Sequence, residues 1–307
     1  MIRSRAYAGE ADYQRVHDLL VESYALTGTT QNWTIDCWDW FRYNGHVFEE
    51  IDGSHRWQSD VRLWKTERRK LVGAAILDDR DLFLQVHPYY RRIEGEMLDW
   101  AERHDQEGCP GGVDNAPLSI YVFEHDQQRQ ALLRGRGYRN LGHESNIRAR
   151  SLDPPLPTFG LPPGYFIRSL DGQDREDLAK RAAVANAAFG ITKHRAETIQ
   201  VLQRAPSYDP ELDLVVVAPD ASFAAYCVLW VDGANRIGMF GPVGTHPAHQ
   251  RRGLGRAMMC EGLRRLQALR TRTAYVDCDA GGVADRLYQA VGFRQCDRLH
   301  HWQKAGR

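Results

Sequence analysis

The chain has 307 residues, and its 40 Lys and Arg residues are balanced by 40 Asp and Glu residues. This formal net charge of zero argues against a nucleic acid or an anionic membrane surface as the partner. No apolar run approaches the ~18 residues that span a bilayer, and the first residues, Met1 to Arg5, lack the apolar stretch of a signal peptide. We therefore expect a cytoplasmic protein.

The cysteines indicate free thiols in a reducing compartment rather than a disulfide framework. No two of the six form a C-x-x-C pair, and disulfide frameworks belong mainly to small secreted chains. We expect Cys227, Cys260 and Cys278 to be core residues, because each lies within an apolar strand or helix pattern. His246 and His249 form a His-x-x-His pair without a third ligand nearby, so no metal is expected. The six cysteines are Cys37, Cys109, Cys227, Cys260, Cys278 and Cys296.

The first half of the chain alternates strand and helix patterns. An opening strand at residues 2–4 precedes a helix whose apolar positions run from Tyr13 to Tyr24. Residues 33–48 also have a helical pattern and carry Trp33, Trp38, Trp40 and Phe41. These aromatic residues could line a substrate pocket, but we favour an amphipathic helix that packs them on a sheet. The elements that follow are strands at 61–65, 70–77 and 82–86, a helix from 93 to 101 and a strand at 118–123.

Three segments recur in the same order in the second half, which indicates a duplicated domain. Ile2-Arg3-Ser4 returns as Ile167-Arg168-Ser169, residues 86–92 resemble 245–251, and residues 132–138 resemble 287–293. Between the copies, residues 151–164 are rich in proline, which favours an extended, semi-rigid linker. We therefore expect a first domain at 1–150, a linker at 151–164 and a second domain at 165–307.

The second half repeats the order of elements. Its helices are expected at 173–188, 194–204 and 283–291, and its strands at 213–217, 223–231, 237–243 and 274–277. This alternation predicts an α/β domain with a mixed sheet flanked by helices. The helix after the strand at 237–243 has one apolar face, formed by Leu254, Met258, Met259, Leu263, Leu266 and Leu269, and one polar face, formed by Glu261, Arg264, Arg265 and Arg270.

A glycine-rich basic segment stands at the start of that helix. The first N–H groups of a helix have no intrahelical partner, and the helix dipole attracts anions there. Gly253 and Gly255 leave those amides accessible to a phosphate, and the arginines of the segment add positive charge. A Walker A loop would need Gly-Lys-Ser/Thr, and a dinucleotide fingerprint would need a third glycine where Met258 stands. From these residues alone, a glycine-rich turn with a solvated basic face is the alternative.

The segment Q-R-R-G-L-G, which follows His246-Pro247, resembles the acetyl-CoA loop of the GCN5-related N-acetyltransferase (GNAT) superfamily. Farther along, R-L-Y-Q-A-V-G-F at residues 286–293 resembles the Leu-Tyr-x-x-x-Gly-Phe segment of that family. The resemblance implies tandem GNAT folds, each a mixed, mostly antiparallel sheet flanked by helices. The size and the tandem order are similar to those of mycothiol synthase, in which the second half is catalytic.

The resemblance also implies where acetyl-CoA binds and which residue transfers a proton. The backbone of Val243, Gly244 and Thr245 would hold the pantetheine arm. Tyr288 would be the general acid that protonates the departing thiolate, whose pKa is near ~8.5; the alternative is a core tyrosine with a satisfied hydroxyl. The pyrophosphate would be held at Gln250, Arg251, Arg252, Gly253, Leu254, Gly255 and Arg256.

Two departures from the family pattern leave the general base open. Gly241 stands where many relatives have a glutamate, and Gly281 stands where an asparagine is common. Asp277 and Asp279 could replace the base by position, and a water relay is equally open. In the first copy, Glu94 replaces the loop glycine and Leu133 the tyrosine. Since a carboxylate at a phosphate-binding helix start repels the ligand, we expect this copy to have lost acetyl-CoA binding.

The resemblance therefore predicts an acetyl-CoA-dependent N-acetyltransferase that acts on a primary amine of a small molecule. An amino-sugar thiol precursor, an antibiotic, a polyamine and a protein N-terminus all stay open as acceptors. The alternative is a non-catalytic acyl-CoA-binding sensor or interaction protein, which Gly241 and Gly281 would favour. We expect a monomer whose halves form a pseudo-dimer.

Overall fold

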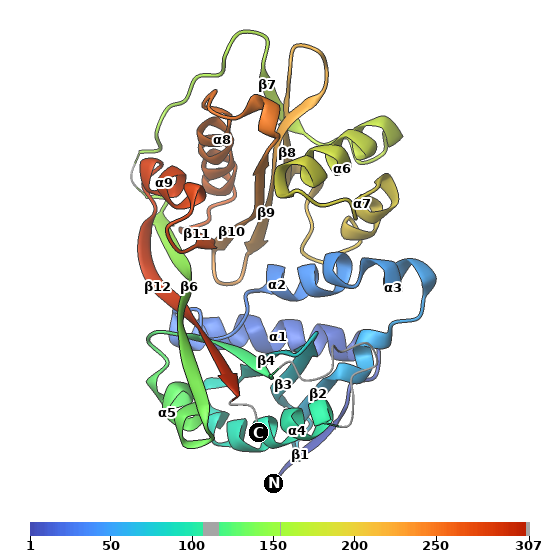
Figure 1. Ribbon diagram of the computed structural model, residues 1–307, viewed down its shortest axis with the longest axis vertical. Helices are drawn as coiled ribbons and strands as arrows, with labels where there is room; N and C mark the ends of the chain where they lie inside the picture. The colour runs from blue at the N-terminus through green and yellow to red at the C-terminus, as the bar shows by residue number, and fades with distance from the viewer. Residues whose placement is uncertain (107–116, 154, 305–307) are drawn as a thin grey trace. The chain divides into compact units, whose positions relative to one another are not determined.

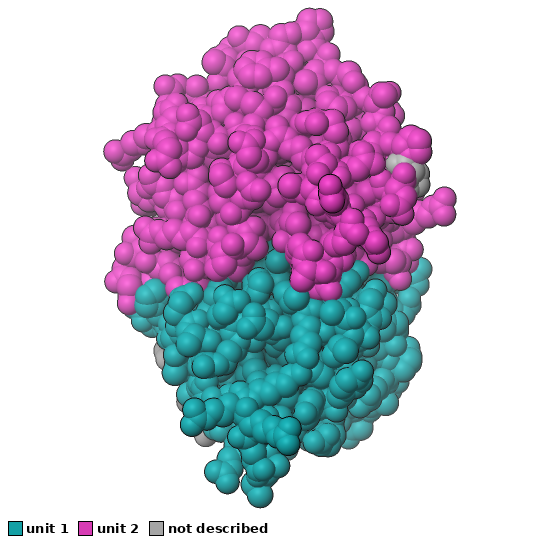
Figure 2. All heavy atoms as spheres, turned by 180° about the vertical axis from the view of Figure 1, so that it is seen from behind, with its two compact units in different colours: residues 1–38, 54–145, 297–307 teal, residues 39–53, 146–296 magenta. Residues whose placement is uncertain are grey.

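The computed structural model describes residues 1–106, 117–153 and 155–304, so Cys109 and Pro154 lie outside the described residues. The chain divides into two compact units (Figure 2). Unit 1 comprises residues 1–38, 54–145 and 297–307, and unit 2 comprises residues 39–53 and 146–296. In the described part of the chain, no helix is long and apolar enough to cross a membrane.

Unit 1 is a mixed sheet with helices on both faces (Figure 1). Its strand order is β1-β2-β3-β4-β5-β12. Pairing is antiparallel except between β4 and β5, which are parallel. The elements are β1 (Ile2–Ala6), α1 (Glu10–Thr27), β2 (Val61–Thr66), β3 (Leu71–Asp78), β4 (Asp81–Val86), α4 (Glu94–Gln106), β5 (Ser119–Phe123), α5 (Gln127–Gly135) and the distal part of β12 (Arg294–Lys304).

Unit 2 has the same architecture. Its strand order is β6-β11-β10-β9-β8-β7, with β10 and β11 parallel and β7 to β10 antiparallel. Helices α8 and α9 lie on one face of the sheet, and α6 and α7 lie on the other (Figure 1). The elements are α3 (Val47–Asp52), β7 (Phe166–Ser169), α6 (Arg175–Phe189), α7 (Ala196–Leu202), β8 (Asp213–Val217), β9 (Phe223–Asp232), β10 (Ile237–Thr245), α8 (Leu254–Ala268), β11 (Thr273–Asp279) and α9 (Val283–Ala290).

Apolar side chains along the strands of unit 2 alternate between the two faces of the sheet and form one core on each face. Leu214, Val216 and Cys227 face α8, whereas Val215 and Tyr226 face α6. Successive strand residues point to opposite faces of a sheet, so this apolar run is buried on both sides. The expected mixed, mostly antiparallel sheet flanked by helices is confirmed.

Each unit takes one strand from the other sequence copy. The distal half of β12, at the end of the chain, pairs antiparallel with β5 of unit 1 over Leu299–Phe123 to Gln303–Ser119. In unit 2, residues 146–151 belong to β6 (Tyr138–Ser151), the neighbour of β11. The predicted boundaries at 150 and 165 describe the two sequence copies and remain a prediction.

Among the local expectations, two need correction and two are confirmed. Residues 33–48 form α2 (Ile35–Trp40), a π-helical segment (Phe41–Gly45) and the start of α3 rather than one helix. Trp38 is a core residue, as favoured, because it is fully buried and stacks on Tyr13 at 5.0 Å between ring centroids. Leu269 does not continue the apolar face of α8, since it follows the last helical residue and is 51% exposed. The predicted core positions of Cys227, Cys260 and Cys278 are confirmed.

Candidate active site

Strand β10 leaves β11 midway along its length. The parallel ladder between them runs from Ile237–Thr273 to Phe240–Val276 and, among the described residues, goes no farther. After a register shift between Phe240 and Val243, β10 continues beside β9 as far as Thr245–Ala225. The indole Nε1 of Trp230 donates a 2.6 Å hydrogen bond to the carbonyl oxygen of Gly241 and holds this irregular turn of the strand. A gap therefore opens between β10 and β11 beyond Phe240.

A cavity of about 410 Å³ occupies this gap. It is bounded by β10, by the end of β11, by the last residue of α6 and by the first turns of α9. A volume of this order suits a small ligand. The lining residues are Phe189, Phe240, Gly241, Pro242, Val243, Asp277, Cys278, Asp279, Gly282, Val283, Ala284 and Tyr288.

Tyr288 brings a neutral hydroxyl to the cavity wall. Its side chain is 5% exposed and packs near Phe293, with 6.2 Å between ring centroids. Within the described residues its hydroxyl has no hydrogen-bond partner, which disfavours the alternative of a core tyrosine with a satisfied hydroxyl. Burial raises the pKa of Tyr288 well above its ordinary value, and the nearby Cys227 and Asp277 add to this rise. Tyr288 thus keeps its proton at neutral pH.

Asp277 and Asp279 occupy the end of β11 and line the same cavity. Between them, Cys278 points the other way and donates a hydrogen bond of 3.2 Å from Sγ to Oδ1 of Asp285. Burial raises the pKa of Asp277, a backbone hydrogen bond opposes this rise, and the charge of Asp279 adds to it.

Two glycines allow the elements around the gap to approach closely. A Cβ atom on Gly244 would lie 2.6 Å from Cε1 of Tyr226 and 2.9 Å from Cβ of Ala188, closer than real Cβ atoms come. A Cβ atom on Gly255 would lie 3.1 Å from Cδ2 of Leu287. The first turn of α8 can therefore rest against α9, one residue away from Tyr288.

The N-terminus of α8 is open to an anion. Gly253, its N-cap, has a left-handed backbone with φ of 79°, and no side chain caps the helix. A Cβ atom at Gly253 would meet no atom within 4 Å. Arg251, Arg252 and Arg256 are exposed beside these free amides, so the segment offers both N–H donors and positive charge, and it fits a pyrophosphate.

Three hydrogen bonds fix the loop that leads to α8. The side chain of Gln250 donates from Nε2 to the carbonyl oxygen of Thr245 at 3.4 Å. Arg252 donates from Nη1 to the hydroxyl of Tyr165 at 3.3 Å, and the same hydroxyl lies 3.0 Å from Nδ1 of His249. The predicted residues Val243, Gly244 and Thr245 on β10, and 250–256 at α8, therefore form one continuous path from the cavity to the helix N-terminus.

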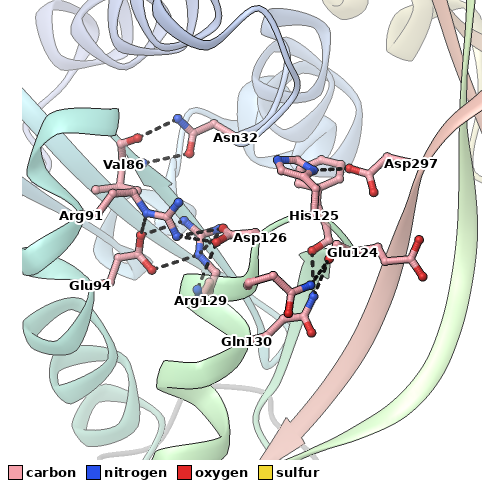
Figure 3. A network of polar contacts seen from close by, with 12 residues as sticks. Asn32, Val86, Arg91, Glu94, Glu124, His125, Asp126, Arg129, Gln130 and Asp297 are labelled. Atoms are coloured by element: carbon pink, nitrogen blue, oxygen red, sulfur yellow. Dashed lines mark hydrogen bonds and ion pairs between the residues drawn. The ribbon is translucent and has the colours of Figure 1, made fainter.

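The matching position in unit 1 is closed by ion pairs (Figure 3). Glu94, the first residue of α4, is 1% exposed. Its carboxylate pairs with Arg91 and, at 3.2 Å, with Nε of Arg129. Asp126 in turn accepts two 2.8 Å hydrogen bonds from Arg91. Burial alone would raise the pKa of Asp126, but the charge of Arg129 and the bonds from Arg91 outweigh it and lower that pKa.

This cluster changes the physical reason for the expected loss of ligand binding. We expected Glu94 to repel an incoming phosphate, which requires an accessible carboxylate. The structure instead buries that carboxylate among two arginines, so the protein's own anions already satisfy the cations at this position. Leu133, at the position of Tyr288, is fully buried in the core of unit 1.

Comparison with known proteins agrees with this geometry. The family model described as acetyltransferase (GNAT) family matches residues 184–293, which include β10, the loop, α8 and Tyr288. Over these residues, the chain is similar to the acetyltransferases of the GNAT family. All of unit 1 lies outside these residues, so the match concerns unit 2 alone.

Relatives named mycothiol acetyltransferase match most of the chain. The mycothiol acetyltransferase of Paenarthrobacter aurescens is 29% identical over 245 residues, which is 74% of this chain and 72% of that protein. The mycothiol acetyltransferase of Saccharopolyspora erythraea is 27% identical over 253 residues, which is 76% of this chain and 77% of that protein. Two solved structures share the whole fold: a GCN5-related N-acetyltransferase from Sphaerobacter thermophilus (TM-score 0.65, 20% identity, 100% of this chain and 97% of that one) and a tandem GNAT protein from the clavulanic acid biosynthesis pathway (TM-score 0.64, 15% identity, 100% of both).

Several cavity residues had no signal in the sequence. Phe189 and Val283 line the cavity, and Trp230 holds β10 through Gly241. These residues lie in ordinary helix and strand patterns, so only the register of β9, β10 and β11 brings them to the gap.

Proposed function

We propose that the chain is an acetyl-CoA-dependent N-acetyltransferase that acylates a primary amine of a small molecule. The observation that carries the proposal is the cavity in the gap between β10 and β11, which has the neutral hydroxyl of Tyr288 on its wall. The match of residues 184–293 to the acetyltransferase (GNAT) family supports the reaction type. The small size of the cavity favours a small acceptor over a polypeptide chain.

The chain's own residues would bind acetyl-CoA along the path described above. The amides and arginines of residues 250–256 would hold the pyrophosphate, and the backbone of Val243, Gly244 and Thr245 would hold the pantetheine arm. Acetyl-CoA supplies the activated acyl group as a thioester. Tyr288, which keeps its proton at neutral pH, would donate it to the sulfur as the carbon–sulfur bond breaks.

The relatives guide the choice of acceptor. Several are named mycothiol acetyltransferase, at 26–29% identity over most of the chain. An amine precursor of mycothiol is therefore the first acceptor to test, followed by polyamines and amino-glycoside antibiotics. We propose that the enzyme works in the cytoplasm as a monomer, with its cysteines as free thiols.

The test is release of free CoA from acetyl-CoA by the full chain against this amine panel, with mass spectrometry of the acceptor. We expect CoA release together with an acceptor that gains one acetyl group. Tight binding of acetyl-CoA without release against any amine would support the alternative of an acyl-CoA sensor. Release with acetylation on oxygen or sulfur would refute the assignment to an amine.

A further inference from the structure

The two faces of β11 separate the residues at the cavity. Val276 and Cys278 belong to the core beneath α8 and α9. Because side chains alternate along a strand, Asp277 and Asp279 point to the opposite face, where α6 packs. Phe189, the last residue of α6, lines the cavity from that side. Tyr288 comes from α9, so the hydroxyl and the carboxylates approach the gap from opposite faces of the sheet.

Asp277 stands where the gap opens. The last pair of the parallel ladder is Phe240–Val276, and Asp277 is the next residue of β11. Across the gap, Gly241 contributes no side chain. Asp277 is therefore the carboxylate nearest along β11 to the end of the ladder, whereas Asp279 is the last residue of the strand.

No cation on the cavity wall neutralises Asp277. The lining residues, all of which lie in the described part of the chain, include no Lys, Arg or His. The other titratable residues of the cavity wall are Asp279 beside Asp277, and Cys278 and Tyr288 from the opposite face of the sheet. β10 and α6 contribute only Gly, Pro, Val and Phe to this wall. The cavity thus carries negative charge and lacks a positive partner.

Two buried carboxylates of unit 2 are paired with arginines. Asp213 lies 3.0 Å from Nε of Arg181, and Asp285 lies 2.6 Å from Nε of Arg148. Asp277 has no such ion pair among the described residues, and its pKa is raised rather than lowered. Asp277 is exposed on the cavity wall, and an unpaired carboxylate in a cavity is a site that a cationic ligand would complete.

We propose that Asp277 binds the acceptor as an alkylammonium ion on the α6 face of the sheet and removes the proton that must leave before the nitrogen attacks. This inference rests on the proposed function and assigns its missing base. It favours acceptors that are protonated at neutral pH, such as aliphatic primary amines. Asp279 adds charge to the same entrance.

The proton and bond changes balance without a further reactant. The ammonium gives one proton to the carboxylate of Asp277 and becomes the neutral amine, which has a free lone pair. The nitrogen then bonds to the acetyl carbon, the carbon–sulfur bond breaks, and the sulfur takes the proton of Tyr288. The nitrogen loses its second proton to the phenolate of Tyr288 through water, which leaves an amide and CoA thiol. The proton on Asp277 passes to solvent, so one proton is released per turnover.

The test compares Asp277→Asn with Glu176→Gln in the full chain, using an aliphatic primary amine that the wild type acetylates. Glu176 lies in the first turn of α6, at the opposite end from Phe189, and the substitution removes the same charge from the surface. At pH 7 we expect kcat/KM to fall about 100-fold or more in Asp277→Asn and to be unchanged in the control. The dissociation constant of acetyl-CoA and the melting temperature should stay near those of the wild type.

The pH profile separates a base from a merely structural residue. In the wild type, the reactive forms are the carboxylate and the ammonium, so kcat/KM should be flat from pH 7 to 9. Without the carboxylate, only the neutral amine reacts, and kcat/KM of Asp277→Asn should rise about tenfold per pH unit toward the ammonium pKa of ~10. With methoxyamine, which is neutral at pH 7, kcat/KM should fall less than about threefold in Asp277→Asn.

The possible outcomes test the role of Asp277 separately from the proposed function. Parallel profiles of the wild type and Asp277→Asn, or an unchanged rate, would overturn the role of Asp277 while leaving the proposed function intact. Failure of the wild type to release CoA with any amine, despite bound acetyl-CoA, would overturn the proposed function and this inference with it.

Discussion

At the scale of single residues, Asp285 links α9 to a strand of the other sequence copy. Its carboxylate accepts from Nε of Arg148 at 2.6 Å and from the side chain of Asn146 at 3.3 Å, both on β6. The hydrogen bond from Arg148 lowers the pKa of Asp285 to about 2. Burial opposes this shift, and further bonds from Cys278 and Asn146 add to it.

This contact predicts a specific pH dependence of stability. Because the folded pKa of about 2 lies below the unfolded value of ~3.9, the stabilisation is complete above the unfolded value and disappears as the pH falls through the folded one. Asp285→Asn should therefore lower the melting temperature by a few degrees at pH 7. Melting curves of both proteins should converge between pH 4 and pH 2, whereas a constant difference from pH 7 to pH 2.5 would contradict the assignment.

The sequence predicts some site residues better than others for a physical reason. Gly253 and Tyr288 stand in motifs whose spacing follows from the ligand. The pyrophosphate requires a helix N-terminus that no side chain blocks, and the departing sulfur requires a hydroxyl, which the next helix supplies. Asp277 was predicted only by position, because its role depends on which face of β11 it occupies. That face follows from the pairing of Phe240 with Val276, which the sequence does not specify.

At the scale of elements, the starts of α8 and α4 show how one motif can be open or closed. Gly253 leaves the first amides of α8 accessible, whereas Glu94 begins α4 as a buried carboxylate paired with Arg91 and Arg129. We therefore expect one acetyl-CoA per chain, bound at α8.

Two substitutions at one position test this difference. Gly253→Glu places a carboxylate at the amides of α8 and should weaken acetyl-CoA binding at least 100-fold, so that calorimetry detects no site. Gly253→Ala is the matched control: it shares the strain of a side chain at φ of 79°, of about 1–2 kcal/mol, but adds no charge. We expect it to bind with less than tenfold weakening. Retained binding in Gly253→Glu, or two sites in the wild type, would contradict the account.

Strand β6 was not predicted from the sequence. Its 14 residues, YRNLGHESNIRARS, are mostly polar and exposed, so they lack the alternation that marks a half-buried strand. Its position depends on a neighbour far away in the sequence. Most strands of the cores, such as β2, β8 and β9, were predicted within one residue because burial on one or both faces imposes an apolar pattern.

At the scale of the whole molecule, the two sequence copies are not separable. Unit 2 needs residues 146–151 of β6, and unit 1 needs the distal half of β12. A chain cut to residues 165–307 would leave the edge of β11 unpaired and Asp285 without Arg148. Exposed strand edges promote aggregation.

We therefore expect residues 165–307 alone to be aggregated or to unfold without cooperativity, and a chain of residues 146–307, which keeps β6, to be more soluble. Circular dichroism melting and size-exclusion chromatography measure both properties. Cooperative unfolding of residues 165–307 at the melting temperature of the full chain would show that the exchanged strand is dispensable.

The central claim is that unit 2 transfers an acetyl group with Tyr288 as the proton donor, and paired measurements on Tyr288→Phe test it most directly. The substitution keeps the buried ring and removes the proton, whereas the acetyl-CoA path at residues 243–245 and 250–256 is untouched. We predict that kcat falls about 10²–10⁴-fold while the dissociation constant of acetyl-CoA changes less than about twofold. Equal loss of turnover and affinity, or no loss of either in an active enzyme, would contradict the account.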